Sequence, residues 1–173
     1  AKYPQAGFMF AAANNAVAEQ MQVALAGETF RHRVELARNA EVLSAADLAL
    51  VASGTATLEV AWHGVPMVVM YNGSKWGYKL VGRWLIRTPH LSLVNILAGR
   101  RIVPEFMPYY PSIEPIAAEA LDILGSPQRQ AAIKADLRAV VQSLGDRNAA
   151  QNTARVAMEM IADTKKMASF EIT

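Results

Sequence analysis

The residues best suited to do chemistry gather in one stretch, ASGTATLEVAWHGVPMVV at positions 52–69. An apolar run ends there at Ser53-Gly54-Thr55, where a helix is predicted to begin, so backbone N–H groups without an intrahelical partner are exposed. Such groups bind anions, and Gly54 would let a phosphate approach the backbone because it has no Cβ. Glu59 follows roughly 7 Å further along the helix axis, within reach of a ribose attached to that phosphate. The stretch therefore predicts a site for a nucleotide diphosphate.

The same residues also fit an ordinary helix start. Ser53 would then cap the helix, and the Glu59 carboxylate would offset the partial positive charge at the helix N-terminus. The local pattern leaves both interpretations open, so the phosphate site is a hypothesis at this point.

Strands and helices are predicted to alternate around this stretch. Apolar runs bounded by turn residues predict strands, and the segments between them predict helices. The run DLALVA at 47–52 is almost continuously apolar, which is typical of a parallel strand covered on both faces. The alternation predicts an α/β fold, with a Rossmann-like parallel sheet flanked by helices. The expected order is strand 7–13, helix from Asn14-Asn15 to Gly27, strand 31–36, helix 39–46, strand 47–52, helix 54–63 and strand 67–71.

The second half of the chain is predicted to be mostly helical. A helix that starts near Lys75 ends at Thr88-Pro89, and the proline-rich segment PEFMPYYP at 104–111 cannot hold a helix. Ser112 and Ser126-Pro127 are predicted to open two further helices, and a third follows into the 160s. We expect two parts: residues 1–111 as a partial Rossmann-like domain, and residues 112–173 as helices that pack on that domain or on a partner.

Charge is polarised along the chain. No acid occurs between Glu59 and Glu105, so this stretch carries +6 while the remainder sums to −4. Cations recur there every four residues and form one strip on a predicted helix, with tryptophans beside them. The strip fits anionic lipid headgroups or a phosphorylated lipid acceptor. The alternatives are a solvated helix face and a nucleic-acid surface, although the aromatic residues share an arc with core-like aliphatic ones. The predicted membrane or acceptor contacts are Lys75, Trp76, Lys79, Arg83, Trp84 and Arg87.

Composition excludes several classes of site. The chain has no cysteine, and its histidines at 32, 63 and 90 lie far apart, so we expect no metal. No apolar run reaches the roughly 18 residues that a membrane-spanning helix needs, and the N-terminus lacks the layout of a signal peptide. These features predict a cytoplasmic protein, and the 53% hydrophobic content of 173 residues is enough to build a core.

Three ordered blocks resemble the lipid-A-disaccharide synthase family. They are ASGTATLEVAWHGVPMVVMY, LVGRWLI and LSLVNILAGRRIVPEFM, and they match the C-terminal half of that family in order and in spacing. The similarity is dense from about Ala45 to Pro108 and less specific elsewhere. Together the three blocks are far more specific than any one of them.

The resemblance implies a GT-B glycosyltransferase, in which two Rossmann-like domains face each other and the C-terminal one holds the UDP-sugar donor. It implies that the Ser-Gly-Thr turn holds the diphosphate and that the acid after it binds the ribose hydroxyls. The UDP-sugar is then a substrate, and no cofactor is expected. The implied substrate-binding residues are Ser53, Gly54, Thr55, Glu59, Tyr71 and Asn95.

The chain also departs from the family pattern. Val94 replaces a usual proline, and Asn72 stands where many members have arginine, so details of the donor or acceptor can differ. The N-terminal domain that carries the acidic catalytic base in the family has no counterpart here, and neither has the Gly-Ser-Arg loop that opens the donor domain. We therefore expect no catalytic residue in this chain, which should bind donor without turnover.

By resemblance, the whole enzyme would move 2,3-diacylglucosamine from UDP to the 6-hydroxyl of 2,3-diacylglucosamine 1-phosphate at the cytoplasmic face of the inner membrane. The implied partners are the UDP-sugar donor, the acylated glucosamine phosphate acceptor, an anionic membrane surface, the missing N-terminal domain and a second copy of the chain. No nucleic acid is expected.

Two other classes of function stay open. One is a different GT-B enzyme that uses a UDP-sugar, such as an epimerase or a peptidoglycan-type transferase. The other is a non-catalytic module that docks on anionic membranes through the basic helix. A binding assay that compares the acylated UDP-sugar with plain UDP-GlcNAc would distinguish the first alternative from the synthase. Liposome binding would test the second.

Overall fold

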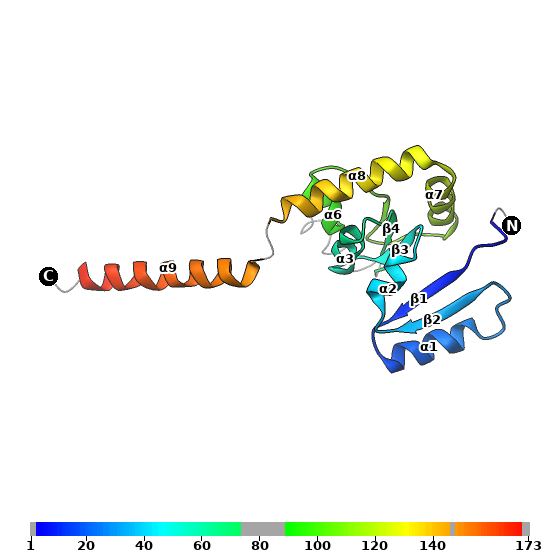
Figure 1. Cartoon of the computed structure of the whole chain (residues 1–173), viewed down its shortest axis with the longest axis horizontal. Helices are drawn as coiled ribbons and strands as arrows, with labels where there is room; N and C mark the ends of the chain where they lie inside the picture. Colours follow the sequence, from blue (N-terminus) through cyan, green and yellow to red (C-terminus); the bar gives the residue numbers. More distant parts are fainter. Residues whose placement is uncertain (1–2, 74–88, 146–147, 171–173) are drawn as a thin grey trace. The chain divides into compact units, whose positions relative to one another are not determined.

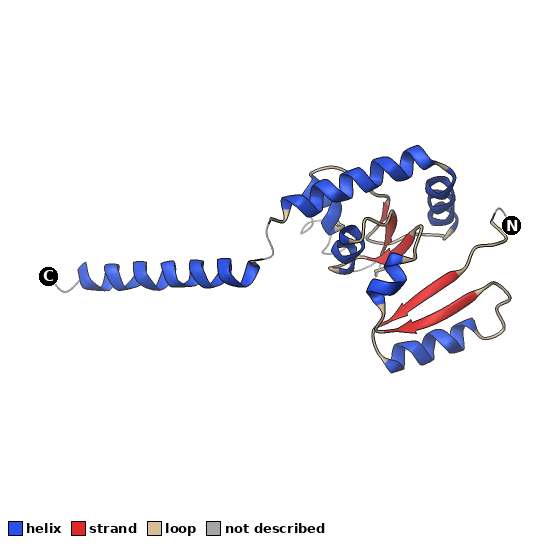
Figure 2. Ribbon diagram, in the orientation of Figure 1, coloured by secondary structure: helices blue, strands red, loops and turns tan. Residues whose placement is uncertain are grey.

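Parallel strands alternate with helices, so the predicted α/β fold with a Rossmann-like sheet flanked by helices is confirmed (Figure 2). A computed structural model describes residues 3–73, 89–145 and 148–170. The chain divides into two compact units, Ala1–Val141 and Gln142–Thr173. Sheets and most helices belong to the first unit (Figure 1).

The first two strands form a sheet of their own. β1 (Phe8–Ala12) pairs in parallel with β2 (His32–Leu36), from Phe8 opposite His32 to Ala12 opposite Leu36. Helix α1 (Asn15–Leu25) packs on both strands. The Asn14 side chain caps this helix as predicted, because its Oδ1 accepts a hydrogen bond from the Val17 amide at 3.0 Å.

A second sheet has the order β3-β4-β5, and all its strands are parallel. Helix α2 (Asn39–Ser44) leads into β3 (Ala49–Ala52), and α3 (Ala56–Trp62) connects β3 to β4 (Met67–Met70). Strand β5 (Glu105–Phe106) lies in the proline-rich segment, where no helix was expected and no strand was predicted. A strand of only two residues shows no hydrophobic periodicity in the sequence, so only its pairing with β4 reveals this strand.

Strand β4 forms the centre of the core. Met67, Val68 and Val69 are completely buried, and they join a cluster that includes side chains of five helices. These helices are α2, α3, α6 (Leu93–Ala98), α7 (Glu114–Gly125) and α8 (Pro127–Ser143). Packing in this core thus fixes the positions of β3 and β4, and with them the residues at the ends of these strands.

The C-terminal helices begin partly as predicted. The Ser126 hydroxyl accepts a hydrogen bond from the Arg129 amide at 3.2 Å and so caps α8. Ser112 does not cap α7: Ile113 is the N-cap residue, and the Ser112 hydroxyl instead lowers the pKa of the Glu114 carboxyl. The second unit carries α9 (Ala149–Phe170), whose Val156, Met158 and Met160 are exposed. The predicted division at residue 111 stays a prediction.

Ala37 adopts a left-handed backbone conformation directly after β2. Its φ is 53°, and among the described residues it is the non-glycine residue with a positive φ. Its amide donates to the Ala12 carbonyl at 2.9 Å, so pairing with β1 holds the residue in place. This turn sets the direction in which the chain enters α2.

Replacing Ala37 with Gly should stabilise the fold. The left-handed conformation costs alanine about 1 to 2 kcal/mol, and the extra backbone entropy of glycine costs about 0.5 to 1 kcal/mol. Urea denaturation should therefore show a net gain of roughly 0.5 to 1 kcal/mol. The matched control is Ala40→Gly within α2, which should destabilise the protein. Equal losses for both variants would show that Ala37 is not strained.

Candidate functional site

Parallel pairing brings the ends of β3 and β4 to one edge of the sheet. The Ser53 amide donates to the Met70 carbonyl at 3.2 Å, and the Tyr71 amide donates to the Phe106 carbonyl at 3.1 Å. The predicted residues Ser53, Gly54, Thr55 and Tyr71 therefore lie at the carboxyl ends of neighbouring strands. Ligands of open α/β sheets bind at this edge.

The Ser-Gly-Thr turn is open above Gly54. This residue has φ 142°, and a Cβ added to it would meet no atom of the described residues within 4 Å. The Thr57 hydroxyl and amide both donate to the Gly54 carbonyl, at 2.7 and 3.1 Å, and so fix the turn. The turn is therefore rigid, but its outer side is accessible to a ligand.

Ser53 does not serve as the helix cap that the alternative interpretation required. Thr55 is the N-cap residue of α3, and its side chain makes no capping hydrogen bond among the described residues. In the described part of the chain, the Ser53 and Thr55 hydroxyls have no hydrogen-bond partner. Two hydroxyls that flank an open glycine are suitable donors to phosphate oxygens.

Glu59 is held from the start of helix α2. Glu59 lies half-buried on α3. Its Oε2 accepts a hydrogen bond from the side-chain Nδ2 of Asn39 at 3.4 Å. Asn39 is the first residue of α2, two residues after Ala37, so the contact joins the start of α2 to α3. No sequence pattern marks Asn39 as a site residue, because its contact with Glu59 spans twenty residues and depends on the tertiary fold.

Tyr71 extends from the end of β4 toward solvent. Its side chain is about half exposed, and its ring lies over Gly73, where an added Cβ would be 3.1 Å from the ring. The Gly73 amide donates to the Pro108 carbonyl at 2.9 Å, which fixes this crossing. Tyr71 thus offers an accessible aromatic face beside the Ser-Gly-Thr turn.

Asn95 lies apart from these residues in the interior. Its side chain is fully buried, its Nδ2 donates to the Val103 carbonyl and to Glu105, and its Oδ1 accepts from the Ile102 and Val103 amides. Both amide hydrogens and both lone pairs are therefore satisfied within the protein. Its predicted contact with the donor stays a prediction, while these bonds make it the residue that ties α6 to the loop before β5.

Glu105 completes this buried polar cluster, which the sequence reasoning missed. Its carboxylate accepts hydrogen bonds from the amides of Leu91 and Ser92, at 3.3 and 3.0 Å, and His90 lies 3.6 Å away. Burial raises the pKa of the Glu105 carboxyl. Hydrogen bonds from Ser92, Asn95 and Leu91 stabilise the charged form more than burial disfavours it, so the pKa lies below its usual value. The buried Ser92 hydroxyl lowers this pKa although it makes no hydrogen bond of standard geometry.

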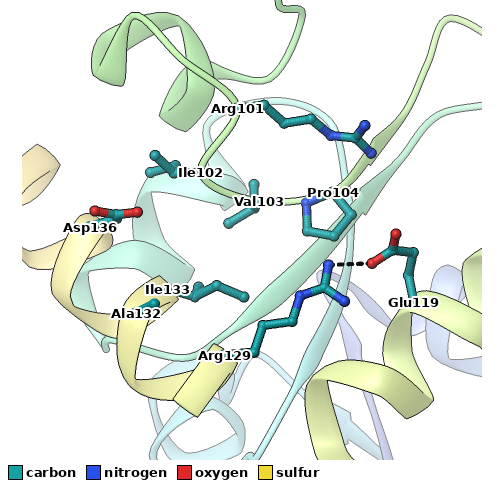
Figure 3. Close-up of a pocket in the computed structure, with 9 residues that line it drawn as sticks. All are labelled: Arg101, Ile102, Val103, Pro104, Glu119, Arg129, Ala132, Ile133 and Asp136. Carbon is teal, nitrogen blue, oxygen red and sulfur yellow. Dashed lines mark hydrogen bonds and ion pairs between the residues drawn. The ribbon is translucent and has the colours of Figure 1, made fainter. Parts of the chain in front are cut away.

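A separate pocket of about 360 Å³ lies at the amino end of β5 (Figure 3). Its charges are largely paired: Arg129 binds Glu119 and Asp122, and Arg100 binds Asp136 at 2.5 Å. The pocket is at the opposite end of the strand from Tyr71 and the Ser-Gly-Thr turn. It therefore does not belong to the candidate site.

Several predicted features fall outside the described residues or concern other kinds of site. The predicted membrane or acceptor contacts at positions 75–87 all lie outside the described residues. Within residues 3–73, 89–145 and 148–170, no three histidine or acidic side chains are grouped so as to hold a metal ion. In the same ranges, no helix combines the length and apolar character required to cross a bilayer.

Comparison with known proteins matches this chain to one family along most of its length. A model of the lipid-A-disaccharide synthetase family matches residues 1–161. A lipid-A-disaccharide synthase from Syntrophus aciditrophicus is 45% identical over 130 residues, which cover 74% of this chain and 34% of that protein. Synthases from Geobacter sulfurreducens and an Anaeromyxobacter species are 34% and 41% identical over 92% and 93% of this chain, and 41% of each relative is covered. The chain thus spans about two fifths or less of these relatives.

Replacing Glu105 with Gln should destabilise the fold by about 1 to 3 kcal/mol at pH 7, because charge-assisted bonds to buried amides are lost. The folded pKa lies below the ordinary value of 4.5, so the stabilisation is present above about pH 4.5 and disappears as the pH falls through the folded pKa. Urea denaturation of both proteins between pH 7 and pH 3 should show a difference that shrinks on acidification. Glu28→Gln, at an exposed position, is the control. A difference independent of pH would contradict this account.

Proposed function

This chain belongs to the lipid-A-disaccharide synthetase family, and on that premise we propose that it binds the UDP-sugar donor of a glycosyl transfer in lipid A synthesis. The observation that carries the proposal is the open Ser53-Gly54-Thr55 turn at the carboxyl ends of the strands. Its unused hydroxyls and its glycine suit a diphosphate better than a structural role.

The diphosphate would be bound mainly by the turn itself. Helix α3 has only seven residues, so its dipole contributes little, and the backbone amides and hydroxyls of the turn must supply most donors. Gly54 permits close approach, because no side chain separates the phosphate oxygens from the backbone. Binding at this turn would place the nucleoside over α3.

The ribose would then lie against Glu59. A carboxylate accepts hydrogen bonds from both ribose hydroxyls, and Asn39 restricts its orientation from the other side. Tyr71 offers an exposed ring at the same edge of the sheet, suited to cover the sugar or the base. Asn95 would act indirectly, by fixing the position of β5 and the chain that follows it.

In the whole protein, the proposed reaction transfers 2,3-diacylglucosamine from UDP to the 6-hydroxyl of 2,3-diacylglucosamine 1-phosphate. The bond between the anomeric carbon and the diphosphate breaks, a bond to the acceptor oxygen forms, the hydroxyl proton leaves to a base and UDP is released. We place that base in the domain that relatives have beyond this chain, so the chain alone should bind without turnover. No cofactor takes part in this scheme.

The basic segment at 75–87 is proposed to contact the lipid acceptor or the anionic surface of the inner membrane from its cytoplasmic side. Support comes from the sequence, in which six cations and no acid occur between Glu59 and Glu105. Lys79 and Arg83 stand in the middle of the cationic strip. Because such attraction adds about 1 kcal/mol per cation, the strip would assist a lipid-processing enzyme.

Calorimetric titration with UDP tests the donor site. We expect saturable binding that weakens by about 1 to 3 kcal/mol in Glu59→Ala, since a charged hydrogen-bond partner of the ribose is lost. Glu28→Ala, checked for unchanged folding like the first variant, should bind as the original chain does. Equal affinity in all three proteins would remove Glu59 from the site. If none binds, the same titration on a chain extended to the length of the relatives decides whether the family's donor site is present.

The role of Asn39 is tested by a double-mutant cycle in the same assay. Asn39→Ala should weaken UDP binding by about 0.5 to 1 kcal/mol in the original chain and have no effect in Glu59→Ala. A positioning role also predicts that Asn39→Ala has no effect on 2′,3′-dideoxyuridine diphosphate, which lacks the hydroxyls that Glu59 would bind. Additive effects of the two substitutions would show that Asn39 does not act through Glu59.

Liposome flotation tests the membrane contact. The chain should float with vesicles that contain anionic lipid, and Lys79→Glu with Arg83→Glu should abolish this, because the strip then carries opposite charges. Vesicles of neutral lipid are the control. Flotation that persists in the double variant would place the membrane contact elsewhere, and absence of flotation in the original chain would contradict the proposal.

A further inference from the structure

The pocket at the amino end of β5 has an apolar floor, formed by Ile102, Val103 and Ile133. These three residues line the pocket and are only 1 to 6% exposed. Pro104 and Ala132 add to the same apolar lining, between the chain before β5 and helix α8 (Figure 3). The volume of about 360 Å³ is near the lower end of the range for small-molecule sites, so the pocket suits a small ligand.

Hydrogen bonds hold the backbone of this floor in place. Asn95 Oδ1 accepts from the Ile102 and Val103 amides at 2.8 and 3.0 Å, and Asn95 Nδ2 donates to the Val103 carbonyl at 3.0 Å. The Pro104 carbonyl accepts from the Val69 amide of the buried strand β4 at 2.9 Å. The floor is therefore preorganised, and a ligand would bind with little loss of chain entropy.

Ion pairs neutralise the acidic side chains that line the pocket. Glu119 on α7 is bound by Arg129, and Asp136 on α8 is bound by Arg100 at 2.5 Å. Arg101 also lines the pocket, but it is exposed, and no hydrogen bond or ion pair joins it to another of the described residues. The pocket thus keeps an uncompensated positive charge beside its apolar floor.

We propose that this pocket binds a small aliphatic monocarboxylate, with the carboxylate on Arg101 and the chain on the apolar floor. A guanidinium presents a planar fork of N–H donors that matches the two oxygens of a carboxylate. Each methylene buried on the floor adds to the affinity. A neutral ligand would leave Arg101 unpaired, whereas a second negative charge would be repelled by the Glu119 and Asp136 carboxylates.

This site is separate from the proposed donor site. The pocket lies at the opposite end of β5 from Tyr71, and none of its lining residues belongs to the Ser53-Gly54-Thr55 turn or to α3. A test of the pocket therefore gives its answer whether or not the chain binds UDP.

Nuclear magnetic resonance titration of the whole chain with sodium hexanoate tests the site. We expect saturable shifts of the Ile102, Val103 and Ala132 amides. Hexanamide and hexyl phosphate have the same chain, and at about pH 8 the first is neutral and the second is a dianion. Both should bind about tenfold more weakly than hexanoate. Equal affinity of either control ligand, or no saturable shift at these amides with hexanoate, would overturn the proposal.

Replacing Arg101 with Gln tests the charged contact in the same titration. This exposed position should tolerate the change, and hexanoate binding should weaken about tenfold while hexanamide binding stays as it was. The matched control is Arg138→Gln, an exposed position on α8 outside the pocket, which should bind hexanoate as the original chain does. Equal effects of the two substitutions would remove Arg101 from the site and overturn the proposal.

Filling the pocket tests the place of the aliphatic chain. Ala132→Phe puts a large side chain into the lining from an exposed position on α8, so it should abolish the binding of hexanoate. Ala131→Phe makes the same change at the neighbouring exposed position, outside the pocket, and should leave binding unchanged. Both variants are compared with the original chain for unchanged folding by circular dichroism. Hexanoate binding that persists in folded Ala132→Phe would place the ligand elsewhere and overturn the proposal.

Discussion

Parallel pairing on both sides of β4 is the constraint on which the described structure depends. This strand is buried, it receives β3 on one side and β5 on the other, and helices α6, α7 and α8 pack on the same core. The carbonyls at its end and at the end of β5 accept the amides of Ser53 and Tyr71. These are hydrogen bonds between backbone groups, so the positions of Ser53 and Tyr71 are set by the strand register. Changes of side chains elsewhere should therefore leave these positions unchanged.

The sequence predicts the parts of this arrangement that are local. Alternating apolar runs and turn residues identified the first four strands, and the Ser53-Gly54-Thr55 turn was placed correctly at the end of β3. Strand β5 and the Asn39 contact with Glu59 were not predictable, because each is defined by a partner that is distant in the chain. The cap assigned to Ser112 was wrong for a local reason, since the first turn of α7 begins one residue later, at Ile113.

Asn95 shows how a family motif and a structure can assign different uses to one residue. The resemblance points to the donor, because Asn95 matches the asparagine of the third block, LSLVNILAGR. In the structure, its amide is saturated by the Ile102 and Val103 backbone and by Glu105. A buried polar cluster that is fully satisfied fixes one arrangement of the chain, because any shift leaves a group unpaired.

Charge balance limits how strongly the proposed site could bind a diphosphate. A diphosphate brings at least two negative charges, whereas α3 is too short to offer a strong dipole. Arg38, the cation that follows β2, is held by Glu35 and Glu41, and Glu59 adds a negative charge to the same region. Strong binding therefore requires positive charge or further backbone amides from outside the described residues. The basic segment at 75–87 is one source of positive charge in the sequence, and salt would weaken its contribution by screening.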